Sequence, residues 1–173
     1  MLTLHTKIDS TEKIDGELTL PFELREKSRQ RASLASGEEV AVFTPRGTVL
    51  RHGDLLKGDD GRVVKIIAAK EATYRIDCTT PRALLRCAFH LGNRHTQAQV
   101  DDEAGLGFLR IRKDPVLKEM LEGLGATVTE ELAAFEPESG AYGGGHHHHG
   151  DAHHNPLAPI PLRQKIHRPS DKD

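Results

Sequence analysis

The chain of 173 residues has no tryptophan, and aromatic residues make up only 4% of it, so any core must be built from leucine, valine, isoleucine and alanine. It also lacks an excess of basic charge, since 24 Lys and Arg against 26 Asp and Glu give a formal net charge of -2. A general nucleic-acid-binding protein would carry a strongly basic footprint, so we expect no nucleic-acid partner. The length suits one domain or two small ones.

Cysteines and long apolar runs are equally scarce. Cys78 and Cys87 are the only cysteines, and their spacing fits neither a disulfide framework nor a zinc knuckle, so reduced cytosolic thiols are expected. The chain does not begin with a basic segment followed by an apolar stretch, and this argues against a signal peptide. The longest aliphatic runs fall well short of the ~20 residues that a membrane span needs. We therefore expect a soluble, cytoplasmic protein with no membrane partner.

Residues 1–70 have the pattern of a small all-β domain. Short segments that alternate or are continuously apolar are separated by turn-forming Gly, Pro and Asp residues. The expected strands are 17–20, 28–36, 39–43, 47–50 and 62–68. Several short strands with turns between them indicate a sheet or a partly open barrel.

Residues 71–142 alternate strands with two helices. Thr80 and Pro81 are typical of a helix start, as are Asp114 and Pro115, and Gly92 and Gly125 are the expected stops. The apolar stripes expected to face the core are Leu84, Cys87, Ala88 and Leu91 on the first helix, and Val116, Leu117, Met120, Leu121 and Leu124 on the second. With strands at 71–78, 97–100, 107–112 and 126–130, the order is βαββαβ, and the fold class is α+β with a ferredoxin-like C-terminal domain.

Residues 143–173 are predicted to be a disordered, metal-binding tail, because their composition cannot bury enough apolar surface. Six histidines fall within residues 146–154, namely His146, His147, His148, His149, His153 and His154. Neutral imidazole suits nickel, copper and zinc. An affinity tag is an alternative, although tags are usually six uninterrupted histidines at a terminus, and a polar linker is another. Ordering such a run costs ~1–2 kcal/mol per residue, so it fits loose buffering better than selective binding.

A selective site requires a fixed ligand elsewhere, and the sequence HLGNRH at residues 90–95 offers His90 and His95. Two histidines five apart on a helix lie roughly 140° from each other around the axis, so they do not naturally chelate one ion. A residue near a twofold axis, however, meets its own copy. We therefore predict that His95 from each of two chains holds one metal ion at a dimer interface. The alternative is that His95 is an ordinary histidine at the surface or in the core, with its hydrogen bonds satisfied and no metal bound.

Other candidate sites have simpler interpretations. Cys87 and His90 could ligate zinc together, but Cys87 lies on the apolar stripe and fits the core better, and Cys78 is expected to be buried too. His5 and His52 are expected at the surface. Asp101, Asp102 and Glu103 are typical of a solvated loop. No nucleophile elbow, phosphate-binding loop or HExxH motif occurs, so the sequence indicates a carrier and no enzyme.

Four features in the same order resemble the UreE family of urease accessory proteins, which are nickel metallochaperones. They are PRGTVLRHGD at 45–54, HLGNRH at 90–95, FEPESGAY at 135–142 and the histidine-rich tail. The resemblance implies an N-terminal β domain that meets protein partners, a metal-binding C-terminal domain and a homodimer. It also implies delivery of Ni²⁺ to apo-urease in a complex with the urease GTPase and other accessory proteins.

The resemblance also implies roles for single residues. His95 matches the nickel ligand at the dimer interface, His90 matches the other motif histidine, and a tail histidine such as His149, His153 or His154 could complete the coordination. Some family members carry a further histidine pair on the strand before the second helix, but residues 108–112 are FLRIR here. Only the resemblance selects nickel over zinc or copper, since ligand type does not.

Two other functions stay open at this point. The tail alone could make the protein a nickel or zinc store. The βαββαβ order is also shared with RRM-type RNA-binding domains, although these need exposed aromatic residues for base stacking and only Phe108 is available. For any histidine site, metal should be released as the pH falls through ~6.5, because imidazole must be neutral to bind.

Overall fold

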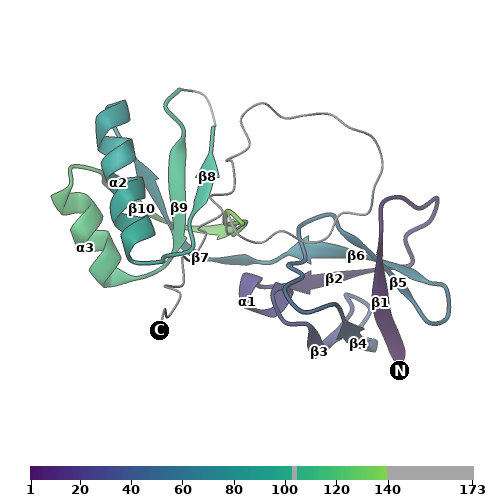
Figure 1. Cartoon of the computed structure of the whole chain (residues 1–173). Coiled ribbons are helices and arrows are strands. Elements are labelled where there is room, and N and C mark those ends of the chain that lie inside the picture. The colour runs from purple at the N-terminus through teal and green to yellow at the C-terminus, as the bar shows by residue number, and fades with distance from the viewer. Residues whose placement is uncertain (103–104, 140–173) are drawn as a thin grey trace, which may run out of the picture. The chain divides into compact units, whose positions relative to one another are not determined.

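A computed structural model describes residues 1–102 and 105–139 (Figure 1). The described chain is a mixed α+β protein with an N-terminal β domain and a C-terminal domain. The first sheet contains β1 (Leu2–Ile8), β2 (Gly16–Leu20), β3 (Arg29–Ser33), β4 (Glu39–Phe43), β5 (Leu55–Gly58) and β6 (Val63–Ala68), and a short helix, α1 (Phe22–Arg25), follows β2. Its strand order is β2-β6-β5-β1-β4-β3, with β1 parallel to β4 and β2 parallel to β6.

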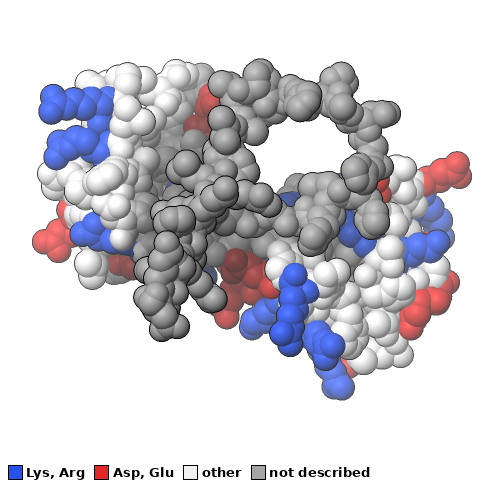
Figure 2. All heavy atoms as spheres, in the orientation of Figure 1, with Lys and Arg blue, Asp and Glu red and all other residues white. Residues whose placement is uncertain are grey.

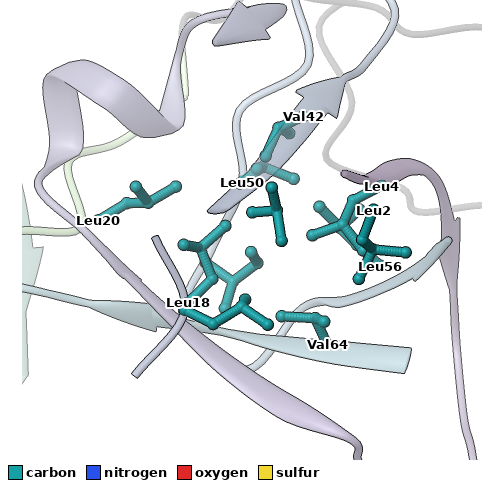
Figure 3. Close-up of a cluster of buried hydrophobic side chains, with 11 residues drawn as sticks. Leu2, Leu4, Leu18, Leu20, Val42, Leu50, Leu56 and Val64 are labelled. Carbon is teal, nitrogen blue, oxygen red and sulfur yellow. The ribbon is translucent and has the colours of Figure 1, made fainter. Parts of the chain in front are cut away.

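Alternation along these strands builds an aliphatic core. Leu2 and Leu4 on β1, and Leu18 and Leu20 on β2, are two residues apart and so face the same side of the sheet, where all four are buried. Figure 3 shows them packed with side chains from the other strands, including Val42, Leu50, Leu56 and Val64. This cluster contains no aromatic residue. The prediction of a wholly aliphatic core was nevertheless wrong for the protein as described, since Phe22, Tyr74, Phe108 and Phe135 are buried.

Five elements of this domain differ from the sequence prediction. The predicted strand at 47–50 does not form, because Gly47 has a positive φ of 83° in a turn and the Leu50 amide donates to the Arg25 carbonyl oxygen. Leu50 is nevertheless fully buried. The strands β1 and β5 and the helix α1 were not predicted. The segment predicted as a strand at 28–36 ends at Ser33, before a turn in which Gly37 has a φ of 87°.

The C-terminal domain contains β7 (Lys70–Asp77), α2 (Pro81–Asn93), β8 (Gln99–Asp101), β9 (Phe108–Arg112), α3 (Pro115–Gly123) and β10 (Thr127–Ala134). These elements follow one another in the predicted order, and the sheet order is β10-β7-β9-β8 with antiparallel pairs throughout. Strand β10 is longer than predicted, because it pairs with β7 from Thr127 opposite Asp77 to Ala134 opposite Lys70.

Both helices pack on one face of this sheet. Cys87 and Leu91 of α2 and Leu121 of α3 share a cluster with strand residues two apart, Tyr74 with Ile76 and Leu109 with Ile111. Figure 1 shows α2 and α3 on the same side of the sheet. The predicted stripes are partly wrong, since Ala88 is exposed and the Val116 side chain is 75% exposed.

The helix starts are confirmed. The Thr80 side chain accepts a hydrogen bond from the Ala83 amide at 3.2 Å, and the Asp114 carboxylate accepts from the amides of Val116 and Leu117 at 2.9 and 3.1 Å. These bonds satisfy amides that have no partner within the helix. Among the described residues, no helix is both long enough and apolar enough to cross a membrane.

Candidate metal centre

His95 lies two residues after the last residue of α2, in the turn that ends the helix. The helix continues through Gly92 to Asn93, so Gly92 is not the stop that the sequence predicted. The His95 amide donates to the Gly92 carbonyl oxygen at 2.9 Å, and the Thr96 amide donates to the Leu91 carbonyl oxygen at 3.1 Å. This pair of bonds is the Schellman motif, and it places His95 at the position where the chain turns left-handed.

The backbone conformation of His95 is unusual. Its φ is 52°, and no other non-glycine residue in the described ranges has a positive φ. The equivalent position after α3 holds Gly125, whose φ is 90°. A side chain in this region costs of order 1 kcal/mol or more, and such residues cluster at functional sites. A histidine is therefore held where the local geometry favours glycine.

The His95 side chain is exposed and borders two hollows in the surface. One, of about 800 Å³, is lined by α2 residues such as Gly92 and by Ser139 of the segment after β10, among others. The other, of about 700 Å³, has more polar walls that include Arg94 and Arg112. An exposed imidazole beside an open cavity is accessible to a metal ion and to ligands from other chain segments.

His90 lies one and a half turns earlier on α2 and is half-buried. Its ring packs edge-on against Phe89, with the ring centroids 5.5 Å apart. The residues lining the two hollows beside His95 do not include His90. In the described part of the chain, therefore, His90 has a different environment from His95.

Neither histidine belongs to a complete ligand set. Within residues 1–102 and 105–139, no group of three or more His, Cys, Asp or Glu side chains is placed to hold a metal ion. The candidate ligands His146, His147, His148, His149, His153 and His154 lie outside the described residues.

The cysteines belong to the core of the C-terminal domain. Cys87 is fully buried in the cluster beneath α2, as predicted, and its sulfur lies 3.9 Å from that of Cys78. Cys78 is half-buried, so the prediction that it is buried was only partly right. Burial, followed by the neighbouring Cys87, raises the pKa of the Cys78 thiol to about 11. A thiol that stays protonated is a poor metal ligand at neutral pH.

Helix α2 also presents uncovered apolar side chains. Leu85 and Phe89, four residues apart and so on one face of the helix, are 70% and 64% exposed. Val100, which follows on β8 and lines the larger hollow beside His95, is 57% exposed. Large apolar side chains grouped on one element are typical of an interaction surface.

The strand before α3 offers no imidazole. Arg110 of β9 pairs with Glu131 at 2.7 Å, and Arg112 donates to the Gln97 side chain at 3.3 Å. Phe108 is buried, with the Arg110 guanidinium 4.9 Å from its ring centroid. It is thus not available for base stacking, which counts against the RNA-binding alternative. Figure 2 shows acidic and basic side chains intermixed on the face in view, without a large area of one sign.

One cluster near the site was missed by sequence reasoning. Arg25 and Arg51 of the N-terminal domain bind Glu136, which follows β10. These partners are 111 and 85 residues apart, and no local pattern links them. The sequence FEPESGAY at residues 135–142 contributed to the family resemblance, but it gave no indication that Glu136 pairs with these arginines.

The structure is thus an α+β protein with a small N-terminal β domain, a C-terminal domain and a candidate ligand histidine at a helix end. Family models for the N-terminal and C-terminal domains of the UreE urease accessory protein match residues 2–69 and 71–157. The chain belongs to the UreE urease accessory protein family.

Three relatives show how far the similarity extends, and each carries the name urease accessory protein UreE. The protein from Janthinobacterium sp. (strain Marseille) is 75% identical over 172 residues, which cover 99% of both chains. The protein from Nitrosospira multiformis is 69% identical over 99% of this chain and 98% of its own. The protein from Burkholderia lata is 53% identical over 135 residues, 78% of this chain and 63% of its own.

Proposed function

We propose that this protein is a cytoplasmic nickel metallochaperone, a carrier and not an enzyme, which delivers Ni²⁺ to apo-urease during assembly of the urease metallocentre. Membership of the UreE family supports a role in urease maturation. The observation that carries the proposal is His95, an exposed imidazole kept in a left-handed turn that favours glycine. Ni²⁺ is the cargo, and Zn²⁺ and Cu²⁺ are its competitors because imidazole binds all three.

The metal is held between two chains. His95 from each chain of a homodimer supplies two ligands across the twofold axis, and histidines 146–149, 153 and 154 supply the rest, with His90 as a further candidate. In support, the described residues of one chain contain no group of three potential ligands. A site that needs a second chain or the tail is open on one side, which suits an ion that must be released.

The exposed apolar face of α2 supports the homodimer. Leu85 and Phe89 lie about two turns and one turn, respectively, before the helix end that precedes His95, so a second copy covering them would bring the two His95 residues toward each other. Fully burying side chains of this size contributes about 1.5–3 kcal/mol each.

Each part of the chain has its own role in this proposal. Residues 1–70 form the β domain that meets protein partners, namely the urease apoprotein and accessory proteins that include the urease GTPase. Residues 71–142 form a ferredoxin-like domain for metal binding and dimerisation. Residues 143–173, which lie outside the described residues, supply auxiliary histidine ligands.

Nickel titration calorimetry on the full chain and on two histidine variants tests the proposal. We expect one tight Ni²⁺ per dimer in the parent chain. His95→Ala should lose this event, whereas His5→Ala, which removes another exposed histidine, should retain it. The mass in solution is measured alongside. If His95→Ala still binds the shared ion tightly, the proposed site is wrong.

Storage through the tail is the second candidate function, favoured by six histidines within nine positions. A chain that ends after Tyr142 separates the two. Tight binding of nickel by this shorter dimer supports delivery from a selective site. Complete loss of binding, with the dimer intact, would favour storage.

A further inference from the structure

Strand β3 has a free edge among the described residues. It is the last strand of the first sheet, and β4 is its one neighbour there (Figure 1). The two strands pair antiparallel, from Arg29 opposite Phe43 to Ser33 opposite Glu39, without a shift of register. Within residues 1–102 and 105–139, no backbone hydrogen bond joins residues 29–33 to a segment other than β4. The far side of β3 therefore carries main-chain groups that another strand could bind.

The main-chain groups at this edge belong to alternate residues. Just before β3 the Thr44 amide donates to the Ser28 carbonyl oxygen at 2.8 Å, and just after it the Leu34 amide donates to the Glu38 carbonyl oxygen at 2.9 Å. In an antiparallel pair, residues that bond to the partner strand alternate with residues whose amide and carbonyl groups point away from it. The even-numbered residues from 28 to 34 thus bond toward β4. The odd-numbered ones face the free edge with their main chain, namely Arg29, Arg31 and Ser33.

The same three residues expose their side chains. Successive side chains of a strand point to opposite faces of the sheet. Ala32 packs against the core of the first sheet, so Arg29, Arg31 and Ser33 lie on the outer face, and all three are exposed. The Arg29 guanidinium lies 5.9 Å from the centroid of the Phe43 ring. A cation over a ring is attracted to it, so this contact favours a position of Arg29 on the outer face of the sheet.

Neither arginine is neutralised by a carboxylate in the part of the chain that the structure describes. No ion pair there includes Arg29 or Arg31. Glu39 lies on the same face, opposite Ser33 and diagonal to Arg31, but forms no ion pair with it. Arg62 of the same domain, by contrast, bonds to two carboxylates. The edge of β3 therefore presents two positive charges, two residues apart, beside main-chain groups that can accept a strand.

We propose that the edge of β3 is a docking site for an extended acidic segment of a partner protein, which adds a strand to the first sheet. This inference rests on the partner-binding role proposed above for residues 1–70. The segment carries Asp or Glu at two positions two residues apart, opposite Arg29 and Arg31. In strand addition, main-chain bonds give affinity and the alternate side chains give specificity. A second copy of β3 does not suit this edge, because arginines on facing strands repel each other.

Titration of the full chain with two synthetic peptides tests the site. One peptide alternates glutamate with valine, and the other has lysine in place of each glutamate. We expect the acidic peptide alone to bind, with an affinity that falls as salt is added. Arg29→Gln combined with Arg31→Gln should weaken its binding at least about tenfold, because two charge-assisted contacts are lost. Calorimetry measures all of these affinities.

Two further variants separate charge from strand pairing. Arg82→Gln combined with Arg86→Gln is the matched control, since it removes two exposed arginines from α2, where no strand edge is present, and it should bind the acidic peptide like the parent chain. Ser33→Pro keeps the arginines of β3 and removes one amide that faces the free edge, a position where a strand tolerates proline. It should weaken the acidic peptide about three- to tenfold, the effect of one hydrogen bond.

Amide hydrogen exchange followed by NMR identifies the mode of binding. In the free protein, the amides of Gln30 and Ala32 should be protected by their bonds to β4, and those of Arg29, Arg31 and Ser33 should exchange faster. A saturating concentration of the acidic peptide should slow exchange at the three odd-numbered residues and leave the two even-numbered ones nearly unchanged. Only the odd-numbered amides gain a hydrogen-bond partner when a strand is added.

The outcomes are distinct. Absence of binding by the acidic peptide, equal binding by the lysine peptide, or equal weakening in the α2 control would overturn the docking site. Binding without slower exchange at residues 29, 31 and 33 would overturn strand addition. The chain with both β3 arginines replaced should bind nickel like the parent. Absence of tight nickel binding in the parent chain would overturn the nickel-carrier function alone.

Discussion

The two sheets of this protein bury their apolar side chains to different extents. The N-terminal sheet encloses eleven buried residues in one cluster, and its large exposed apolar side chains are few and scattered, namely Met1, Ile14 and Phe43. The C-terminal domain encloses a smaller cluster and leaves six large apolar side chains exposed, namely Leu85, Phe89, Val100, Leu106, Val116 and Leu132. The first domain thus covers most of its large apolar side chains by its own packing. The second domain leaves more of them exposed, and some of these lie near the candidate ligand His95.

Because of this difference, we expect substitutions in the two domains to affect different properties, namely the stability of the fold and the association with a second chain. Residues that hold the first domain together are far from the candidate metal centre in the sequence, and their replacement should act on folding. Exposed residues of α2 should act on association with a second chain and only weakly on folding. The variants below probe whether the two domains differ in this way.

The largest effect is expected from Leu18→Ala, because Leu18 is fully buried in the first sheet. Such a change leaves a cavity, and the free energy of unfolding should fall by about 2–5 kcal/mol. Leu132→Ala is the matched control, since this leucine is 71% exposed on β10 and its loss should cost less than about 0.5 kcal/mol. Urea denaturation measures both. Similar losses for the two variants would contradict the comparison.

The next effect concerns the thiol at the edge of the second core. With a pKa of about 11, Cys78 is almost wholly protonated at pH 8, since burial and Cys87 disfavour its thiolate. Alkylation by iodoacetamide at pH 8 should therefore be about a hundredfold slower than that of a free cysteine, and should accelerate up to pH 11. Cys78→Ala should abolish the reaction of the folded chain, because Cys87 is fully buried. Rapid labelling at pH 8 would show that this core is more open than described.

Association should respond to the apolar face of α2. We expect Phe89→Ser to raise the dissociation constant of the dimer about 10- to 100-fold, since burial of a side chain of this size contributes about 1.5–3 kcal/mol. Leu132→Ser removes an equally exposed apolar side chain from β10 and serves as the control. Sedimentation equilibrium measures both constants. A stronger effect of the control would move the interface from α2 to the sheet.

The smallest effect is expected at the start of α2. Thr80→Ala removes the hydroxyl oxygen that accepts a hydrogen bond from the Ala83 amide, and the free energy of unfolding should fall by about 1 kcal/mol. Thr79→Ala, at the exposed residue just before it, should have almost no effect. Thermal unfolding followed by circular dichroism distinguishes them. Equal stabilities of the two variants would mean that the helix does not depend on this cap.

Local signals account for what the sequence predicted well. The starts of both helices follow from a capping side chain and a proline, and both features act within four residues. The strands β4 and β6 follow from short apolar runs between turns. The strand predicted at 47–50 was wrong because Gly47 turns the chain and the Leu50 amide donates to the Arg25 carbonyl oxygen, a contact that no local pattern encodes.

The candidate site was predictable only in part. The sequence placed His95 near a helix end and at a loop, because Gly92 and Asn93 disfavour a continuing helix. It did not predict that the helix runs past Gly92, or that His95 itself takes the left-handed conformation. Nor did it link Glu136 with Arg25, since the two residues are 111 positions apart in the sequence.

The left-handed turn at His95 has a consequence for sequence variation. Glycine would suit this backbone at least as well as histidine, as Gly125 illustrates after α3. A search for a more thermostable chain, guided by folding alone, would thus tend to replace the residue that the proposed carrier function needs most. Histidine at this position carries a cost to stability, and the metal site proposed above gives a reason for it.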